Sequence, residues 1–305
     1  MKSIAVLIPC YNEEHTIGEV VFSFKKYLPH AIIYVYDNCS EDSTVEVARS
    51  AGAVVMRAVG KGKGNVVRKM FADVDADIFV MVDGDSTYDA SVALHMVQLI
   101  ESSAVDMVVA VRKENSDAAS PRGHRIGNKM FNLILKTLFH STFRDVFSGY
   151  RAFSRRFVKT FPAMTNGFDI EVEMSIHALM LSIPFDEIES IYQKRPANSH
   201  SKLHTFSDGL KILLRIIALL KETRPLLFFG SISLFLSCIA LLLAYPLMVT
   251  FLETGLVPRL PTAVLATGIM LISFLSLTCG MILDSISQAR AEIKKLHYLR
   301  VPRIS

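Results

Sequence analysis

Tryptophan is absent from the 305 residues of this sequence, and its four cysteines include no C-x-x-C pair. No disulfide framework or zinc site is therefore indicated. The phosphate-loop pattern G-x-x-x-x-G-K-[ST] is missing, as are H-E-x-x-H, G-x-S-x-G and a G-x-G-x-x-G after the first apolar run. These absences argue against an NTPase, a dinucleotide-dependent oxidoreductase, a zinc protease and a serine hydrolase.

The chain carries little net charge, only +4. Aromatic residues do not alternate with basic ones as they do in nucleic-acid readers, so no nucleic-acid partner is predicted. The basic residues gather near two long apolar runs, which favours contact with anionic lipid headgroups. The first apolar run, residues 4–8, is too short for a signal peptide, and we expect the first 200 residues to stay in the cytoplasm.

Residues 226–251 and 263–283 contain no charged residue, and each run is long enough to cross a hydrocarbon core of about 30 Å as a helix. We predict two transmembrane helices, with a pair of buried core helices as the alternative. Pro246 is expected to kink or end the first. The flanking basic residues are Lys211, Arg215, Lys221 and Arg224 before the first run, and Arg290, Lys294, Lys295, Arg300 and Arg303 after the second. The positive-inside rule then places both termini in the cytoplasm.

Short β-branched runs alternate with amphipathic stretches in the first 111 residues, which predicts an α/β fold with a mostly parallel sheet. The expected strands are 4–8, 32–36, 53–56, 78–82 and 107–111, and the expected helices are 13–27, 42–50, 65–72 and 91–101. A polar loop at 114–125, a helix at 127–139, a loop around 145–151, a helix from about 169 to 181 and a strand at 184–192 follow. We predict a domain over 1–205, an amphipathic juxtamembrane helix over 206–225, a transmembrane region over 226–283 and a basic tail over 284–305.

Three of these strands end directly in polar or acidic clusters. They are Pro9-Cys10-Tyr11-Asn12-Glu13-Glu14, Asp37-Asn38 and Asp83-Gly84-Asp85. Ligands of open α/β sheets bind outside the carboxyl ends of the strands, so the three clusters are expected to share one site.

Asp83-Gly84-Asp85 places two carboxylates on either side of a glycine that permits a tight turn. Mg²⁺ and Mn²⁺ prefer such oxygen ligands together with substrate phosphates, so a divalent cation is predicted here. The alternative is that both aspartates only cap the next turn.

Basic residues follow in two groups. Lys61-Gly62-Lys63-Gly64-Asn65 opens a predicted helix and suits an anionic ligand, although a flexible surface loop fits equally well. Several arginines and lysines lie between the acidic clusters and the apolar runs, where they are candidates for holding a phosphate or are solvated surface charges. They are Arg112, Arg122, Arg125, Lys129, Arg151, Arg195 and Lys202.

With these motifs the chain resembles glycosyltransferase family 2, in particular its dolichol-phosphate mannose synthase and polyprenyl-phosphate glycosyltransferase branch. The opening segment, the Asp37-Asn38-Cys39-Ser40-Glu41-Asp42-Ser43-Thr44 segment and Asp83-Gly84-Asp85 carry the resemblance in order. Arg125-Ile126-Gly127-Asn128, Asp145-Val146-Phe147-Ser148-Gly149-Tyr150-Arg151, Phe168-Asp169-Ile170-Glu171 and Ser201-Lys202-Leu203 are similar to acceptor-side elements of the branch.

The resemblance implies a GT-A fold, a Rossmann-like domain of nucleotide-diphospho-sugar transferases, followed by two membrane helices. It implies that Pro9, Tyr11, Glu13 and Asp37 hold the nucleotide and that Asp83 and Asp85 hold Mg²⁺ or Mn²⁺. It also implies that Arg112, Arg125, Ser148 and Arg151 engage the acceptor phosphate or hold its loop. Asp85 and Asp145 are the predicted catalytic residues, with Asp145 the candidate base, and Lys63 and Lys202 join the predicted substrate-binding set.

Two positions depart from the family pattern. Thr87 stands where close relatives often carry a glutamine that binds the metal, and Asn38-Cys39 replaces the frequent Asp-Gly. The third metal ligand and the contacts to the donor base are therefore not assigned.

The expected activity is inverting transfer of a sugar from a UDP- or GDP-linked donor to a polyprenyl phosphate at the cytoplasmic membrane face. One alternative is a family member that acts on a saccharide or another glycolipid, although the Q-x-x-R-W segment of processive synthases is excluded by the lack of tryptophan. The other is a noncatalytic membrane scaffold. Assembly into a homo-oligomer is left open.

Overall fold

A computed structural model describes residues 2–102, 104–114, 142–164, 170–193 and 217–303, together with residues 136, 137 and 214. The chain divides into two compact units. One comprises Met1–Ile212 and Lys294–Ser305, and the other comprises Leu213–Ile293. The four-part division predicted from the sequence stays a prediction.

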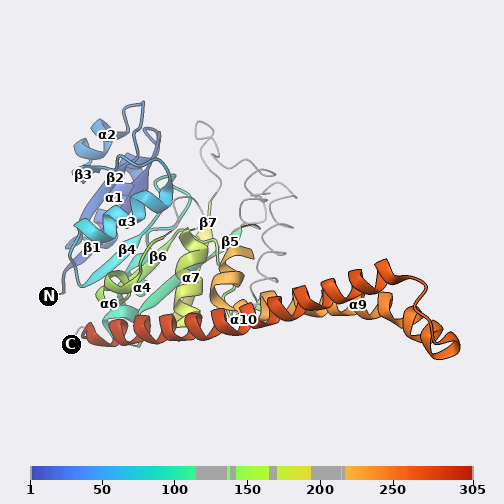
Figure 1. Ribbon diagram of the computed structural model, residues 1–305. Helices are drawn as coiled ribbons and strands as arrows, with labels where there is room; N and C mark the ends of the chain where they lie inside the picture. Colours follow the sequence, from blue (N-terminus) through green and yellow to red (C-terminus); the bar gives the residue numbers. More distant parts are fainter. Residues whose placement is uncertain are drawn as a thin grey trace. The chain divides into compact units, whose positions relative to one another are not determined.

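The first unit is built on a seven-stranded sheet with the order β3-β2-β1-β4-β6-β5-β7 (Figure 1). Its strands are β1 (Ile4–Cys10), β2 (Ile32–Asp37), β3 (Val54–Arg57), β4 (Ile78–Met81), β5 (Met107–Glu114), β6 (Arg151–Ser154) and β7 (Phe185–Tyr192). Among these strands only β6 runs antiparallel to its neighbours. The predicted mostly parallel α/β sheet is confirmed.

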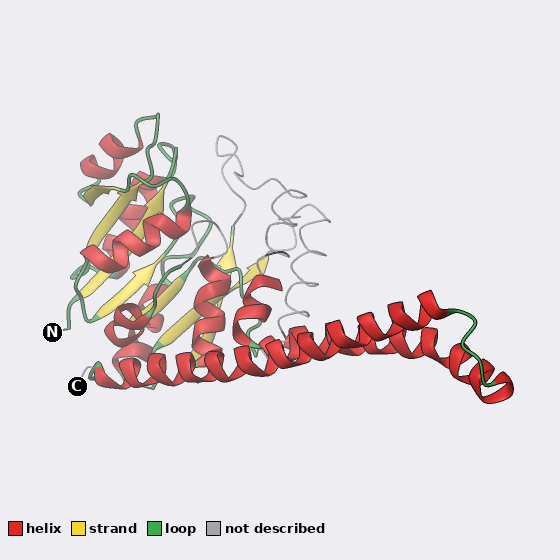
Figure 2. Cartoon of the chain, in the orientation of Figure 1, coloured by secondary structure: helices red, strands yellow, loops and turns green. Residues whose placement is uncertain are grey.

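Helices lie on both faces of this sheet (Figure 2). They are α1 (Ile17–Tyr27), α2 (Thr44–Ser50), α3 (Lys63–Asp73), α4 (Val92–Glu101), α6 (Arg155–Thr160) and α7 (Ile170–Met180). Helix α1 packs with α2 and α4, whereas α3 packs with α6 and α7. Helix α1 buries Ile17, Val20, Val21 and Phe24, the i, i+3, i+4, i+7 spacing of one helical face. Strand β4 is buried at all four positions, as expected for a strand covered on both sides.

Strand β6 and helix α6 were not predicted from the sequence. The four residues of β6 are all buried and too few to show a period, and their antiparallel partners are β4 and β5 on either side. The predicted helix at 127–139 and almost all of the loop at 114–125 fall outside the described residues.

The second unit contains two long apolar helices, α9 (Pro225–Thr254) and the greater part of α10 (Leu260–Arg300). Both are long and apolar enough to cross a membrane. Pro246 was expected to kink or end the first span. It lies inside α9 and does not end that helix, and the kink stays a prediction. Small polar side chains join the helices, because Ser273 Oγ lies 2.9 Å from Ser233 Oγ and 2.7 Å from Ser237 Oγ. Small residues at contacts and large apolar residues outside are typical of helix pairs in lipid, and Leu242 on the outer surface is 74% exposed.

The last turns of α10 belong to the first unit. Tyr298 is buried there and donates a hydrogen bond to the Asp106 carboxylate, which also accepts from Ser154 Oγ at 2.6 Å. Arg156 Nε donates to the Tyr298 carbonyl at 2.9 Å, and its guanidinium lies over the Tyr298 ring. The C-terminal residues are therefore an integral part of the α/β unit.

Candidate active site

The sheet topology brings the predicted site residues to one edge. Cys10 at the end of β1 pairs with Asp37 at the end of β2, and β4 runs parallel to β1 and leads into Asp83. Strand β5 runs in the same direction and carries Arg112 towards its end, while the reversed strand β6 begins with Arg151. The carboxyl ends of β1, β2, β4 and β5 and the start of β6 therefore share one edge, as the sequence predicted for the first three.

The loops after β1 and β2 are tied together by backbone-to-side-chain hydrogen bonds. The Asn12 amide donates to Ser40 Oγ at 2.9 Å, and the Glu13 amide donates to Thr44 Oγ1 at 2.8 Å. Asp37 is buried and accepts from the Ser40 amide at 3.0 Å. The structure thus brings the segment after Pro9, with Tyr11 and Glu13, beside the segment after Asp37.

Asn38 connects this region to the glycine-rich segment before α3. Its amide group donates to the Gly60 carbonyl at 2.7 Å, and its Oδ1 accepts from the Gly62 amide at 2.8 Å. Gly62 has φ 112°, a conformation that side chains rarely permit. The departure from the family pattern at Asn38 therefore has a structural role, because it fixes the turn that begins α3.

The side chain of Lys63, the first residue of α3, is 9% exposed and lies between two carboxylates. Its Nζ lies 2.5 Å from Asp83 Oδ1 and also forms an ion pair with Glu171 of α7. Burial alone lowers the pKa of Lys63, but the two carboxylates more than offset this, so the net pKa is raised. Burial also raises the pKa of Glu171, with Lys63 acting in the opposite direction. Lys63 is thus a fixed positive charge at the acidic turn.

The acidic turn packs closely on β1. A side chain at Gly84 would collide with Cys10 Sγ, and Thr16 Oγ1 donates to the Gly84 carbonyl at 2.7 Å. Asp85 is buried and accepts a hydrogen bond from Thr87 Oγ1 at 2.6 Å. Thr87 therefore orients the Asp85 carboxylate, so the residue in place of the family's glutamine supports a candidate ligand.

The donor set at this turn fits a hard divalent cation that takes further ligands from a substrate. Asp83 is partly exposed, and Asp85 is held by Thr87. Within the described ranges no group of three or more His, Cys, Asp or Glu side chains is arranged to hold a metal ion. Mg²⁺ and Mn²⁺ commonly take one or two carboxylate ligands from the protein and complete their octahedron with phosphate oxygens and water. Asp83 and Asp85 would supply the two carboxylates.

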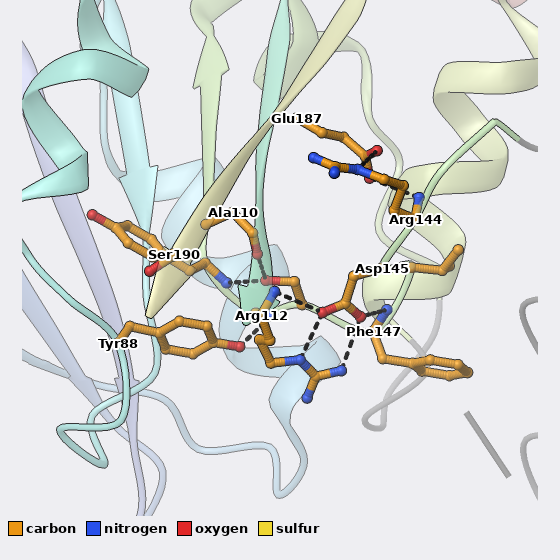
Figure 3. Close-up of polar contacts among 12 residues, drawn as sticks. Tyr88, Ala110, Arg112, Arg144, Asp145, Phe147, Glu187 and Ser190 are labelled. Atoms are coloured by element: carbon orange, nitrogen blue, oxygen red, sulfur yellow. Dashed lines mark hydrogen bonds and ion pairs between the residues drawn. The ribbon is translucent and has the colours of Figure 1, made fainter. Parts of the chain in front are cut away.

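Arg112 and Asp145 form a bidentate ion pair on the other side of the site (Figure 3). Arg112 Nε lies 2.7 Å from Asp145 Oδ2, and a second guanidinium nitrogen lies 2.9 Å from Oδ1. The Phe147 amide also donates to Oδ1, at 3.3 Å. Burial raises the pKa of Asp145, but the hydrogen bonds and charge of Arg112 outweigh it, so the pKa is lowered. Asp145 is therefore an ionised carboxylate that positions Arg112.

Ser148 and Arg151 hold the loop that carries Asp145. Ser148 Oγ donates to the Ala110 carbonyl at 2.6 Å. Arg151 is fully buried and donates to the carbonyls of Ser148 at 2.9 Å and Val146 at 2.6 Å. Burial lowers the pKa of Arg151 to about 10. Ser148 and Arg151 were predicted either to engage the acceptor phosphate or to hold its loop, and these hydrogen bonds are those of residues that hold the loop.

Comparison with known proteins gives the family. A model described as glycosyl transferase family 2 matches residues 5–161, just over half of the chain. Glycosyltransferase AglJ of Haloferax volcanii is 31% identical over 304 residues, which cover 97% of this chain and 98% of that protein. The chain belongs to glycosyl transferase family 2.

Further similarities of this family 2 glycosyltransferase concern its branch and its fold. A dolichyl-phosphate hexose transferase of Haloferax volcanii is 28% identical, with 72% of this chain and 95% of that protein covered. The crystal structure of glucosyl-3-phosphoglycerate synthase from Mycobacterium tuberculosis, in complex with Mn²⁺, UDP and phosphoglyceric acid, has a TM-score of 0.55 at 21% identity. That match covers 72% of this chain and 78% of the other. The predicted GT-A fold is confirmed.

Some residues of the family 2 site were assigned from the sequence, and others were not. Glu171 was quoted in a motif without a role, although a buried acidic residue on a helix signals a cationic partner. Tyr88 follows the acidic turn and received no role. Arg125 and Lys202 fall outside the described residues, so their predicted roles stay predictions.

Proposed function

We propose that this family 2 glycosyltransferase moves a sugar from a nucleoside diphosphate sugar to a polyprenyl phosphate. The observation that carries the proposal is the single sheet edge that holds an acidic turn with Lys63 on one side and the Arg112–Asp145 pair on the other. The acidic turn with Lys63 suits a metal-bound diphosphate, and the Arg112–Asp145 pair suits the phosphate of an acceptor. The relative named dolichyl-phosphate hexose transferase and the UDP bound in the solved neighbour support this reading.

The donor is assigned to the loops after β1 and β2, where Pro9, Tyr11, Glu13 and Asp37 hold the nucleotide. Asp83 and Asp85 would hold Mg²⁺ or Mn²⁺. A bound divalent ion supplies charge neutralisation for the diphosphate leaving group. Lys63 adds a second positive charge beside Asp83, where it stabilises the negative charge that develops as the bond to the sugar breaks.

The acceptor is assigned to Arg112. Its guanidinium is held by Asp145 in a fixed plane, which suits recognition of a phosphate. An acceptor phosphate oxygen attacks the anomeric carbon, the bond from that carbon to the diphosphate oxygen breaks, and the nucleoside diphosphate leaves with the configuration inverted. The acceptor phosphate is already ionised at neutral pH, so positioning and charge supply most of the rate. The base role predicted for Asp145 stays a prediction that requires its release from Arg112.

We further propose that α9 and α10 cross the membrane with both chain termini in the cytoplasm, where the acceptor lipid is presented. Large apolar side chains are exposed along α9 and along the first part of α10, and the connection between the two helices carries one charged residue, Arg259.

The experiment uses the full chain in detergent with a polyprenyl phosphate, Mn²⁺ or Mg²⁺, and a panel of radiolabelled UDP- and GDP-sugars. We expect label in the organic phase with one donor, and we expect Asp85→Ala to abolish it while the circular dichroism spectrum stays unchanged. Label that stays in the aqueous phase as a new product would indicate a different acceptor. Nucleotide-sugar binding without turnover of any acceptor would support the noncatalytic alternative, and near-normal activity of Asp85→Ala would remove the metal assignment.

A further inference from the structure

Tyr88 lies where three parts of the site meet. We call residues 83–88 the metal loop and residues 145–150 the acceptor loop. The Tyr88 hydroxyl accepts a hydrogen bond from the Gly149 amide of the acceptor loop at 3.1 Å. Its ring lies edge-on to Tyr150 and to Tyr192 of β7, with centroid distances of 5.4 and 5.2 Å. One side chain therefore contacts the acceptor loop and the last strand of the sheet.

The backbone of Tyr88 is fixed by β7 as well. Tyr88 forms an isolated antiparallel bridge with Tyr192, and the Gln193 amide donates to the Thr87 carbonyl at 2.8 Å. Thr87 in turn donates to Asp85. The end of the metal loop is thus anchored on β7 as well as on the acceptor loop.

Gly149, the partner of Tyr88, lies directly against the centre of the acidic turn. A Cβ atom at Gly149 would collide with the Asp83 carboxylate and would lie 2.9 Å from Lys63 Nζ. Gly149 is buried, so its amide depends on the Tyr88 hydroxyl in place of water. This hydrogen bond therefore fixes the backbone of the acceptor loop at the residue that contacts Asp83.

Arg112 shares this arrangement. Its guanidinium lies over the Tyr192 ring, 5.5 Å from the centroid, and its carboxylate partner Asp145 begins the acceptor loop. A displacement of the acceptor loop at Gly149 would therefore move the Asp145 end of the pair.

We propose that Tyr88 is a positioning residue that holds the acceptor loop against the metal loop, so that its hydroxyl controls use of the acceptor and leaves nucleotide binding unchanged. This inference rests on the proposed function in assigning Arg112 to the acceptor. The substitution Tyr88→Phe removes one oxygen atom, keeps the ring contacts with Tyr150 and Tyr192, and leaves the buried Gly149 amide without its acceptor.

For Tyr88→Phe we expect kcat/KM for polyprenyl phosphate to fall about 5- to 100-fold, the range set by one unsatisfied buried group. The Kd for UDP or GDP in the presence of Mn²⁺ is expected to stay within about twofold of the wild type. Tyr27→Phe, which removes the hydroxyl of an exposed tyrosine at the end of α1, is the matched control and should leave both quantities unchanged. An unchanged kcat/KM in Tyr88→Phe, or an equal loss of nucleotide affinity, would overturn the proposal.

Hydrogen exchange provides a readout that does not need turnover. Peptides that cover the acceptor loop should exchange faster in Tyr88→Phe, whereas peptides that cover residues 37–44 should exchange at the wild-type rate. Equal exchange of the acceptor loop in both proteins would contradict the positioning role. If the wild type makes no lipid product from any donor, the proposed function fails, and the exchange result still decides the role of Tyr88.

Discussion

The structure predicts that loss of the Lys63 charge is strongly destabilising. The Lys63 side chain is only 9% exposed, and its ammonium group pairs with Asp83 and with Glu171, whose side chain is 5% exposed. Lys63→Met keeps a similar stem and removes the charge. Two carboxylates then face each other without a cation between them, and the Glu171 carboxylate is largely shielded from water.

The expected cost follows from removing one partner of a buried ion pair, which is about 3–5 kcal/mol. For a unit of roughly 200 residues this corresponds to a fall in Tm of about 6–20 °C. The loss should depend on pH. Without Lys63 the pKa of Glu171, already raised by burial, rises further above that of the unfolded chain, so the folded state binds the extra proton. Stability of the variant is then greatest at low pH and decreases as the pH rises.

The assay is thermal unfolding in detergent, followed by circular dichroism because the chain has no tryptophan. Melting curves at pH 7.5 and 5.5 compare the wild type, Lys63→Met and the double variant Lys63→Met/Glu171→Gln. The double variant should recover about half of the lost stability, since one of the two unpaired carboxylates is gone. Lys69→Met is the matched control on the same helix. Its partner is Asp73 in an exposed i,i+4 pair, and its loss should cost less than about 0.5 kcal/mol.

Two results would refute this reasoning. One is a Tm for Lys63→Met within about 2 °C of the Lys69→Met control at pH 7.5. The other is a difference in Tm between the wild type and Lys63→Met that becomes larger when the pH is lowered from 7.5 to 5.5. That result would mean that no carboxylate near Lys63 takes up a proton.

Two further predictions concern other ion pairs and hydrogen bonds. Arg112→Lys keeps the charge but cannot make both bonds to Asp145, so we expect transfer to polyprenyl phosphate to fall about 10- to 100-fold with nucleotide affinity retained, as measured by initial rates. Tyr298→Phe removes a donor from the buried Asp106 carboxylate and should cost about 1–3 kcal/mol in thermal unfolding, whereas an unchanged Tm would show that Asp106 is stabilised by its other partners.

The first five strands along the chain could be predicted closely from the sequence. The expected strand at 78–82 is β4 (Ile78–Met81), and the expected strand at 107–111 is the first part of β5 (Met107–Glu114). Strands that are buried on both faces have nearly continuous apolar sequences, so they can be predicted without knowing which strands they pair with. The order of the strands was not visible, because it depends on pairing between residues that are distant in the chain.

Candidate site residues could be chosen from the sequence only where polar or charged residues lie at or directly after the end of a predicted strand. Asp83 and Asp85 were chosen as candidate metal ligands because two carboxylates follow an apolar run, and Arg112 was chosen as a candidate phosphate-binding residue because arginine suits phosphate. These roles stay predictions. The ion pair of Lys63 with Glu171 spans more than 100 residues of sequence and joins two helices, so no local sequence pattern predicts it. Asn38 shows the same limit, because its departure from the family pattern gained a meaning only when its contacts with Gly60 and Gly62 were known.

The contact of Tyr298 with Asp106 determines when the enzyme can be completed during synthesis. Residues 1–212 leave the ribosome well before residues 294–303, and both apolar helices are made in between. Until residue 298 has been made, the buried Asp106 carboxylate lacks one of its donors, and the first unit cannot form all of its contacts. A shortened enzyme made by stopping after residue 212 would keep that deficiency permanently, and a version without the apolar helices would need residues 294–303 joined back by a linker.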